Sequence, residues 1–559
     1  MIVVGALVEI AGNGVDPVDG GVAIWRDGDF VYGCAEERIT RKKYSGGFRR
    51  SLRFGLDQLG LNYGDIDAYS FVSYGEPFNT RVEHIARQAP ELAPFADRIH
   101  FTSSHHEAHA LGAARLSPWD ESLVVVLDNE GLILGPQLSE VTVFNSMERA
   151  SYYLASAGSL DLLSRDLFGR HDTSLGEAYR RFSYYCGFPS HQLAGKTMAL
   201  APYGNARAFG SLQVFASDGS SIKVDLNGRY DRPAEAVVDF FKRNGFDVAP
   251  PRGADDPFSD DHLNAAAFVQ EQLEIVAANR ISALLDATGQ ERICLSGGVA
   301  YNCRLVAHLE EVLGVPVFVP PSPGDQGLGV GAAISYLERS GIARGRYPPI
   351  ARLGGVVRCS SEEVRVAANS VGAELTETNG NAELARLIVE CLIAGGIVAI
   401  VEGKSEFGRR ALGARSLLSL PQETPAERLR QLKRREWFRP FGASMLRSAA
   451  DRAFGNDIAD AFMLRAPKAI FKEELGNLLH IDGTLRAQVV DDDNGTLIAS
   501  VLRTLVDFGK PGVVINTSFN LDGEPLVETE AEGIALFVNH DQIDGLALAN
   551  SGFYLARGG

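Results

Sequence analysis

Short apolar runs alternate with stretches of helical spacing along most of this 559-residue chain. Residues 2–7, 293–295, 317–319, 397–401 and 513–515 are continuous apolar runs of the kind that forms buried strands. Helical patterns follow several of these runs after a loop that contains glycine. Regular alternation of the two patterns predicts an α/β fold.

Two segments of the chain have the pattern of a hairpin that opens a domain. Residues 22–25 and 30–35 flank an Asp27-Gly28 turn. A similar unit is predicted at residues 123–127, with a turn at residues 129–131 and a second strand from Ile133 onward. Two such starts predict an internally duplicated domain, although no repeat of individual residues is visible.

The chain is too long for one hydrophobic core, so at least two domains are expected. The best linker candidate is the Pro-, Gly- and Arg-rich stretch at residues 344–349, after which a new α/β region begins. We therefore predict domains at residues 1–350 and 351–559.

The composition and net charge of the chain limit the classes of partner and the cellular location that we expect. The chain is 45% hydrophobic and 22% charged with a net charge of −17, which argues against a nucleic-acid partner. The predicted strand at its start lacks the basic leader of a signal peptide, and no apolar run is long enough to span a membrane. None of its six cysteines has the spacing of a zinc site or a CxxC pair, so reduced thiols and a cytoplasmic location are expected.

The densest cluster of metal-ligating side chains lies in the first half. His105 and His109 are four residues apart in a segment of helical character, so they share one helix face. Asp128 ends a predicted strand and Asp325 precedes a predicted helix, where it would also serve as an N-cap. Two imidazoles and two carboxylates suit iron(II) or another divalent ion, although a packed histidine cluster remains an alternative.

Candidate nucleotide and phosphate sites occur in both halves. Gly297 and Gly298 lie between a predicted strand and helix, where backbone can approach phosphate, although the chain has no Walker loop. The second half places basic residues at 409–410, 433–435 and 439, which suits a small polyanion. The run at 433–435 is equally typical of a solvated helix face.

Several motifs together resemble the antibiotic O-carbamoyltransferases related to nodulation protein U, a family that includes the tobramycin, novobiocin and cephamycin enzymes. The resemblance runs nearly end to end, and the order of the motifs makes chance agreement implausible. The motifs are Ala35-Glu36-Glu37-Arg38 with Arg41-Lys42-Lys43, His105-His106-Glu107-Ala108-His109-Ala110, Gly195-Lys196-Thr197-Met198-Ala199-Leu200-Ala201-Pro202-Tyr203-Gly204, Ser296-Gly297-Gly298-Val299-Ala300-Tyr301-Asn302, Pro323-Gly324-Asp325-Gln326-Gly327, Phe438-Arg439-Pro440-Phe441 and Asn516-Thr517-Ser518-Phe519-Asn520 with Gly523-Glu524-Pro525.

The resemblance implies a first domain with the actin-like, Hsp70-like ATPase fold of the threonylcarbamoyladenosine transferases, and a second domain that is YrdC-like. It implies that the second domain forms carbamoyl-adenylate from carbamoyl phosphate and ATP, with Mg(II) as a possible companion of ATP. The first domain would then transfer the carbamoyl group near a metal, usually Fe(II), to a small-molecule acceptor.

The resemblance also assigns site residues by position. The metal ligands would be His105, His109, Asp128 and Asp325. Residues around carbamoyl phosphate and ATP would be Lys433, Arg439, Ser518 and Asn520, with Arg410 and Arg486 as additions. Nucleotide contacts in the first domain would be Lys196, Gly297, Gly298 and Asn302.

The chain departs from the family pattern near its start. Val15 stands where the family carries a histidine, and Tyr44 stands where it carries another. Asp16 is therefore our candidate for the general base of transfer. The acceptor would be a hydroxyl of a secondary metabolite, or less favourably an amine. The alternatives are carbamoyl or threonylcarbamoyl transfer to a protein or tRNA, an actin-like sugar kinase and a nucleotide-binding pseudoenzyme; the sequence does not predict the oligomeric state.

Overall fold

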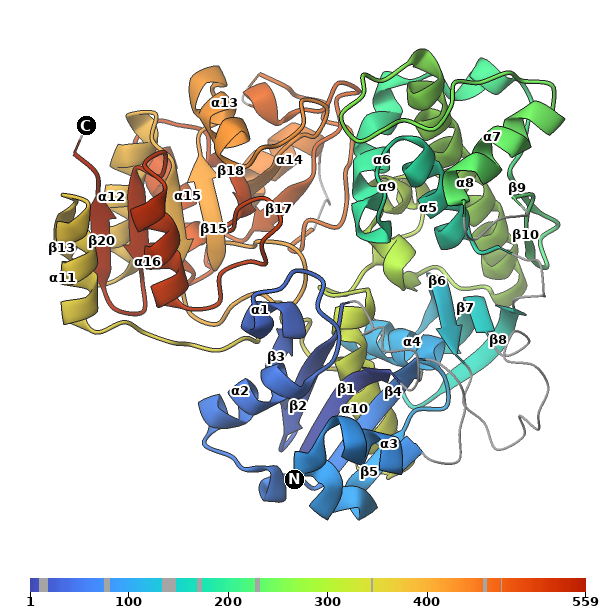
Figure 1. Ribbon diagram of the computed structural model, residues 1–559, viewed down its shortest axis with the longest axis horizontal. Coiled ribbons are helices and arrows are strands. Elements are labelled where there is room, and N and C mark those ends of the chain that lie inside the picture. The colour runs from blue at the N-terminus through green and yellow to red at the C-terminus, as the bar shows by residue number, and fades with distance from the viewer. Residues whose placement is uncertain are drawn as a thin grey trace. The chain divides into compact units, whose positions relative to one another are not determined.

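The computed structural model describes residues 1–9, 19–74, 81–132, 147–167, 173–226, 232–342, 345–455, 460–473 and 475–558. The chain divides into two compact units (Figure 1). The first, here the N-terminal unit, comprises Met1–Val31, Tyr44–Arg49 and Asn62–Pro349. The second, here the C-terminal unit, comprises Tyr32–Lys43, Arg50–Leu61 and Ile350–Gly559. A single division at residue 350 therefore omits two early segments that pack with the C-terminal unit.

Two five-stranded sheets with the same strand order organise the first 350 residues. One has the order β3-β2-β1-β4-β5 and the other β8-β7-β6-β11-β12. In each, the central strand, β1 or β6, pairs antiparallel with the next strand in the chain and parallel with β4 or β11. This repetition confirms the predicted internal duplication and the actin-like α/β class. The strands are β1 (Ile2–Glu9), β2 (Gly21–Arg26), β3 (Asp29–Ala35), β4 (Ala68–Tyr74), β5 (Ile99–Phe101), β6 (Ser122–Leu132), β7 (Met147–Ala155), β8 (Leu160–Leu167), β11 (Ile293–Ser296) and β12 (Val317–Phe318).

The two predicted hairpins have different outcomes. Between β2 and β3 the backbone turns at Asp27 and Gly28, both with positive φ, as the Asp-Gly signal predicts. The predicted turn at residues 129–131 is wrong, because β6 continues through it with an irregularity between Leu127 and Gly131 and pairs with β7. The predicted second strand from Ile133 lies outside the described residues. A bulge keeps a strand paired but changes the direction in which its side chains point. The residues that predict a turn are also compatible with a bulge, so the sequence does not distinguish the two.

Ten α-helices are described in the first 350 residues, and α1 and most of α2 belong to the C-terminal unit. The helices of the first 350 residues are α1 (Glu36–Thr40), α2 (Arg49–Leu59), α3 (Arg81–Gln88), α4 (His105–Leu116), α5 (Leu175–Tyr185), α6 (Ala194–Leu200), α7 (Pro233–Arg243), α8 (Asp260–Thr288), α9 (Cys303–Leu313) and α10 (Leu328–Arg339). Helices α4 and α10 approach each other closely at Gly331. A Cβ on this residue would lie only 1.8 Å from the carbonyl oxygen of Ala108, so only glycine fits there. Helix α7 was not predicted, because it lies in a polar, turn-rich stretch of the sequence.

The C-terminal unit is built on an eight-stranded mixed sheet of order β13-β20-β19-β14-β15-β18-β16-β17. Its predicted strands at residues 397–401 and 513–515 are confirmed as β14 and β18. The strands are β13 (Glu374–Glu377), β14 (Val398–Val401), β15 (Arg415–Ser419), β16 (Gly442–Leu446), β17 (Ala487–Val490), β18 (Val513–Ser518), β19 (Gly545–Leu548) and β20 (Phe553–Ala556). The helices are α11 (Ser361–Ser370), α12 (Asn381–Ile393), α13 (Glu423–Leu432), α14 (Arg447–Phe454), α15 (Leu497–Asp507) and α16 (Glu530–Asn539).

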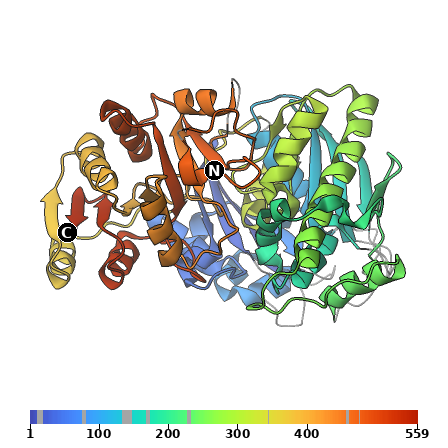
Figure 2. The same cartoon turned by 90° about the horizontal axis from the view of Figure 1, so that it is seen from above.

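Helices cover both faces of this sheet (Figure 2). Successive residues of a strand point to opposite faces. Val398 and Ile400 accordingly share a core with α12 and α15, whereas Ala399 and Val401 share a second core with α11, α13, α14 and α16. All four residues of β14 are buried, which explains why the strand is continuously apolar in sequence.

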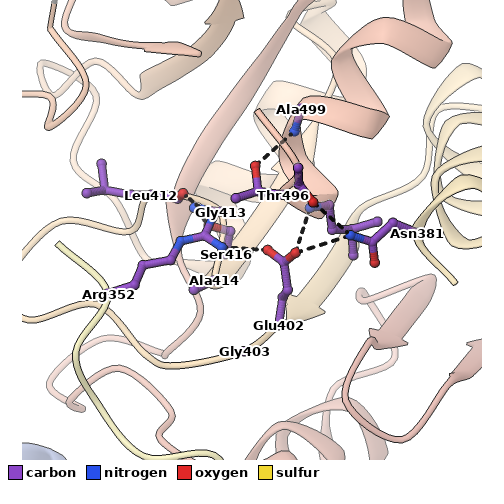
Figure 3. Close-up of polar contacts among 12 residues, drawn as sticks. Arg352, Asn381, Glu402, Gly403, Leu412, Gly413, Ala414, Ser416, Thr496 and Ala499 are labelled. Atoms are coloured by element: carbon purple, nitrogen blue, oxygen red, sulfur yellow. Dashed lines mark hydrogen bonds and ion pairs between the residues drawn. The ribbon is translucent and has the colours of Figure 1, made fainter. Parts of the chain in front are cut away.

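The partly buried carboxylate of Glu402 forms hydrogen bonds at the starts of both α12 and α15 (Figure 3). Glu402 follows β14, and its Oε1 accepts a hydrogen bond of 2.6 Å from the backbone N–H of Leu497, the first residue of α15. Its Oε2 accepts one of 2.6 Å from the Arg352 guanidinium, and Asn381 at the start of α12 also donates to Oε1, at 3.5 Å. Free N–H groups at a helix start favour a carboxylate, so Glu402 stabilises α15.

Among the described residues, no helix combines the length and the apolar character that a transmembrane span requires.

Candidate functional sites

The four predicted metal ligands come together in the N-terminal unit. His105 and His109 lie one turn apart on the same face of α4. Asp128 lies in β6 at its irregular stretch, and Asp325 begins the short helical turn before α10. One nitrogen or oxygen from each residue lies within 4.8 Å of all the others.

The spacing and chemistry of these four side chains fit a divalent metal ion. His109 Nε2 lies 3.1 Å from Asp128 Oδ2 and 3.5 Å from Asp325 Oδ1. His105 Nε2 lies 3.6 Å and 3.4 Å from the same two oxygens. Neighbouring ligands that each bind one ion at about 2.1 Å are separated by about 3.0–3.4 Å. The donor set, two imidazole nitrogens and two carboxylate oxygens, suits a borderline divalent ion.

A buried glutamate, Glu148, fixes the start of the helix that carries the histidines. It accepts hydrogen bonds from the backbone N–H of His106 and the hydroxyl of Ser104, both at 3.2 Å. Ser104 in turn accepts from the backbone of Glu107 as the N-cap of α4. Arg165 lies 2.7 Å from Glu148 and balances its charge. Sequence reasoning missed Glu148, since nothing local marks a residue 40 positions away in the chain as a partner of the histidine motif.

The glycine turn at Gly297 and Gly298 holds the candidate metal ligand Asp128 in place. The backbone N–H of Gly298 donates to Asp128 Oδ1 at 3.1 Å. Gly297 has a φ of +89°, and a Cβ there would lie 2.3 Å from the carbonyl oxygen of Leu127. Glycine is therefore required by the approach of two backbone segments and by the left-handed conformation.

The electrostatics of the cluster reflect burial and the two carboxylates. Burial alone would lower the pKa of His105, but hydrogen bonds and charges from Asp128 and Asp325 outweigh it and raise that pKa to about 10. Burial, reinforced by the charge of Glu177, raises the pKa of Glu130 to about 7. Asp128 and Asp325 thus supply negative charge beside the two histidines, and a bound cation would balance it.

The remaining predicted nucleotide residues of the N-terminal unit are Asn302, shortly after the glycine turn, and Lys196, on a helix that contacts the start of α9. Asn302 caps α9 by accepting from the backbone of Leu305, and its amide exchanges two hydrogen bonds with Gln270. Lys196 lies on α6, with its ammonium 5.8 Å from the centre of the Phe188 ring. Helix α6 meets the start of α9 where the sulfurs of Met198 and Cys303 are 3.8 Å apart. Asp16, the predicted general base, lies outside the described residues.

The C-terminal unit contains a buried lysine with a dense set of acceptors. Lys433 is only 9% exposed. Its ammonium donates to the backbone oxygen and hydroxyl of Ser518 at 2.8 Å and 3.3 Å, and to the backbone and side-chain oxygens of Asn520, both at 2.6 Å. The structure therefore brings together three residues predicted for the carbamoyl phosphate and ATP site.

Further cations surround this lysine. Burial lowers the pKa of Lys433 well below its ordinary value, and the positive charges of Arg435, Lys43 and Arg439 lower it further. Burial has the same effect on the Arg435 guanidinium, assisted by Arg439 and Arg486. Only Arg434 of the basic run at 433–435 is exposed, so the run is not simply a solvated helix face. Accumulated positive charge of this kind attracts a polyanion.

Arg410 lies in a loop joined to the central strands of the same unit. The side-chain amide of Asn516 on β18 donates to the carbonyl of Ala411 at 3.3 Å, and that of Gln488 on β17 donates to Leu412 at 3.1 Å. Sequence reasoning predicted Arg410 and Arg439 but missed Arg435, because a basic run does not reveal which of its members are wholly or partly buried.

Curated relatives align along most of the chain. Nodulation protein NolNO of Sinorhizobium fredii is 28% identical, over 96% of this chain and 79% of its own length. 3'-Hydroxymethylcephem-O-carbamoyltransferase of Amycolatopsis lactamdurans is 24% identical, over 97% of this chain and 98% of its own. Nodulation protein U of Sinorhizobium fredii is also 24% identical, over 90% of this chain and 92% of its own length.

Solved structures show more distant likenesses. The HypF protein of T. kodakarensis matches with a TM-score of 0.32 and 14% identity, over 60% of this chain and 48% of its own. A ROK hexokinase from Thermus thermophilus matches with a TM-score of 0.28 and 15% identity, over 61% of this chain and all of its own.

Family models account for both halves of the chain. The model described as carbamoyltransferase N-terminus matches residues 95–334, which include all four residues of the candidate metal cluster. The model described as carbamoyltransferase C-terminus matches residues 389–554, which include Lys433, Ser518 and Asn520. The chain belongs to the carbamoyltransferase family and is an enzyme of that class.

Proposed function

We propose that this enzyme is an ATP-dependent carbamoyltransferase that works through carbamoyl-adenylate. Water hydrolyses carbamoyl phosphate to carbamate and inorganic phosphate. A carbamate oxygen then attacks the α-phosphorus of ATP and displaces pyrophosphate. AMP is a far better leaving group than hydroxide, so the adenylate makes carbamate reactive towards a weak nucleophile. The acceptor would be a hydroxyl, or less favourably an amine, of a small molecule in natural-product biosynthesis.

The observation that carries this proposal is the buried Lys433 ammonium among Ser518, Asn520 and neighbouring guanidinium groups. We assign adenylate formation to this site and consider the C-terminal unit YrdC-like. Arg439, Arg410 and Arg486 would hold phosphate oxygens by forked, charge-assisted hydrogen bonds. Magnesium would accompany ATP.

We assign carbamoyl transfer to the N-terminal unit. A metal ion held by His105, His109, Asp128 and Asp325, with Fe(II) preferred, would stabilise negative charge on a phosphate or carbamoyl oxygen. The glycine turn at 297–298 orients Asp128, while Lys196 and Asn302 would contact the nucleotide. Asp16 remains our candidate for the base that takes the acceptor's proton. Transfer of a carbamoyl group to a hydroxyl oxygen is also the chemistry named in the Amycolatopsis relative.

Pyrophosphate release from ATP and carbamoyl phosphate tests the proposal. We expect wild type and His109→Ala to release pyrophosphate, and Lys433→Met to lose at least about 100-fold in rate, because a charge-assisted contact to phosphate disappears. His109→Ala is the matched control, since it alters the N-terminal unit alone. Absence of release by wild type supplied with Mg(II) and Fe(II) would contradict adenylate formation and favour a binding-only role.

A further inference from the structure

The loop that carries Asp325 in the N-terminal unit is anchored on both sides of this residue. Before it, the carbonyl of Pro323 accepts a hydrogen bond from the backbone N–H of Gly297 at 2.9 Å. After it, the side-chain amide of Gln326 donates to Asp19 Oδ1 at 3.2 Å, across 307 positions of the chain. The second anchor therefore joins the loop of a candidate metal ligand to the residues that lead into β2, against which this loop also packs.

Asp19 is held in an unusual backbone conformation. Its φ is +68°, in the left-handed region that residues with a side chain seldom adopt. Its backbone N–H donates to the carbonyl of Tyr44 at 3.4 Å, and the next N–H, that of Gly20, donates to the carbonyl of Ser45 at 3.2 Å. A Cβ on Gly20 would lie 2.1 Å from the carbonyl oxygen of Gly47, so this close approach requires glycine. The backbone at Asp19 is thus fixed independently of its carboxylate.

Stability alone does not account for the pairing of Asp19 with Gln326. The two residues are only 6% and 1% exposed. Because an ionised carboxylate can only accept hydrogen bonds, it fixes the amide of Gln326 with its nitrogen towards Asp19. The amide oxygen is then buried without a hydrogen-bond partner among the described residues. A buried carboxylate, an unpaired amide oxygen and a left-handed backbone all oppose folding, and such features are typical of functional sites.

We propose that Asp19 and Gln326 are positioning residues for Asp325, whose carboxylate their hydrogen bond places relative to the two histidines. This inference rests on the proposed function, which assigns a metal ion to these ligands. Asp325 and Gln326 belong to one helical turn of three residues, so a shift of the amide moves the carboxylate. Asp325 Oδ1 lies 3.4 Å from His105 Nε2 and 3.5 Å from His109 Nε2, on a different element. Partners that orient a ligand in this way set the affinity for the metal.

Anaerobic titration of the full-length protein with Fe(II) and Co(II) tests the inference, and the visible spectrum of bound Co(II) reports the ligand geometry. Gln326→Glu sets two carboxylates against each other, and we expect it to lower the affinity for both metals by about 10- to 100-fold. The double variant Asp19→Asn/Gln326→Glu exchanges donor and acceptor at unchanged size, so it should recover most of the loss and the wild-type spectrum. Gln290→Glu makes the same chemical change just beyond the end of α8 and should bind metal as wild type does.

The outcomes separate this inference from the metal assignment on which it rests. If Gln326→Glu binds both metals as tightly as Gln290→Glu, or if the double variant recovers nothing, the positioning role is wrong while the metal site stands. Should thermal unfolding show that Gln326→Glu does not fold, Gln326→Met takes its place, because it removes the amide and keeps the volume. Unchanged affinity of that variant would equally overturn the role. If wild type binds neither metal, the metal assignment fails and the inference fails with it.

Discussion

Glu406 holds the loop that carries Arg410, and its removal should weaken the C-terminal unit. The carboxylate is 2% exposed. Its Oε1 accepts hydrogen bonds from the backbone N–H groups of Leu412 at 2.7 Å, Ala414 at 2.9 Å and Arg415 at 3.2 Å. Three donors on one oxygen close the loop into a fixed shape.

The size of the effect follows from these contacts. Glu406→Ala leaves three buried N–H groups without their acceptor, and each such group costs about 1–3 kcal/mol. The three bonds share one oxygen and are not additive, so we expect a loss of about 3–5 kcal/mol in the free energy of unfolding. Glu406→Gln keeps a carbonyl oxygen in place but removes the charge, and should lose about 1–3 kcal/mol.

Urea unfolding of the full-length protein, followed by tryptophan fluorescence and far-UV circular dichroism, measures these losses. Glu374 provides the matched control, because it is an exposed glutamate on the edge strand β13 of the same unit. Glu374→Ala should unfold within about 0.5 kcal/mol of wild type. The KM for ATP should rise in Glu406→Gln, since the loop that presents Arg410 loses its fixed shape.

Two results would refute this reasoning. If Glu406→Ala unfolded at the same urea concentration as Glu374→Ala, the carboxylate would not stabilise the loop. If Glu406→Gln lost stability with unchanged kinetics for ATP, the loop would not position a substrate-binding group.

The remaining predictions concern other buried polar groups. Asp128→Asn should lower affinity for Fe(II) by more than about 10-fold, measured by metal titration, and equal metal content would contradict the ligand assignment. Glu402→Ala should lower the free energy of unfolding by about 2–4 kcal/mol, because the N–H of Leu497 and the Arg352 guanidinium lose their partner; unchanged urea unfolding would refute this. His262 accepts from the Ser259 N–H and donates to Pro250, which fixes the neutral ring, and burial lowers its pKa. Because the unfolded chain then binds more protons, stability should fall as pH drops below about 6.5, and His262→Asn should flatten that fall in unfolding curves from pH 7 to 5.

Local patterns in the sequence account for much of the fold. Continuous apolar runs mark β1, β11, β14 and β18, because strands buried on both faces need no polar positions. The Asp27-Gly28 turn follows from residues that tolerate positive φ. The spacing of His105 and His109 places both rings on one helix face before any tertiary contact is known.

Tertiary structure decided which distant residues meet. The sequence suggested a turn after Asp128, yet the strand continues through an irregularity and presents the carboxylate to two histidines. It did not reveal that Lys433 is buried while Arg434 is exposed, because neighbours in a charge run differ only in what packs against them. Nor did it show that Lys43 joins the C-terminal unit, since that placement depends on long-range contacts made by Arg38 and Arg41. Hydrogen bonds and charges act over a few ångströms of space whatever the separation along the chain, so the composition of both sites is set by folding.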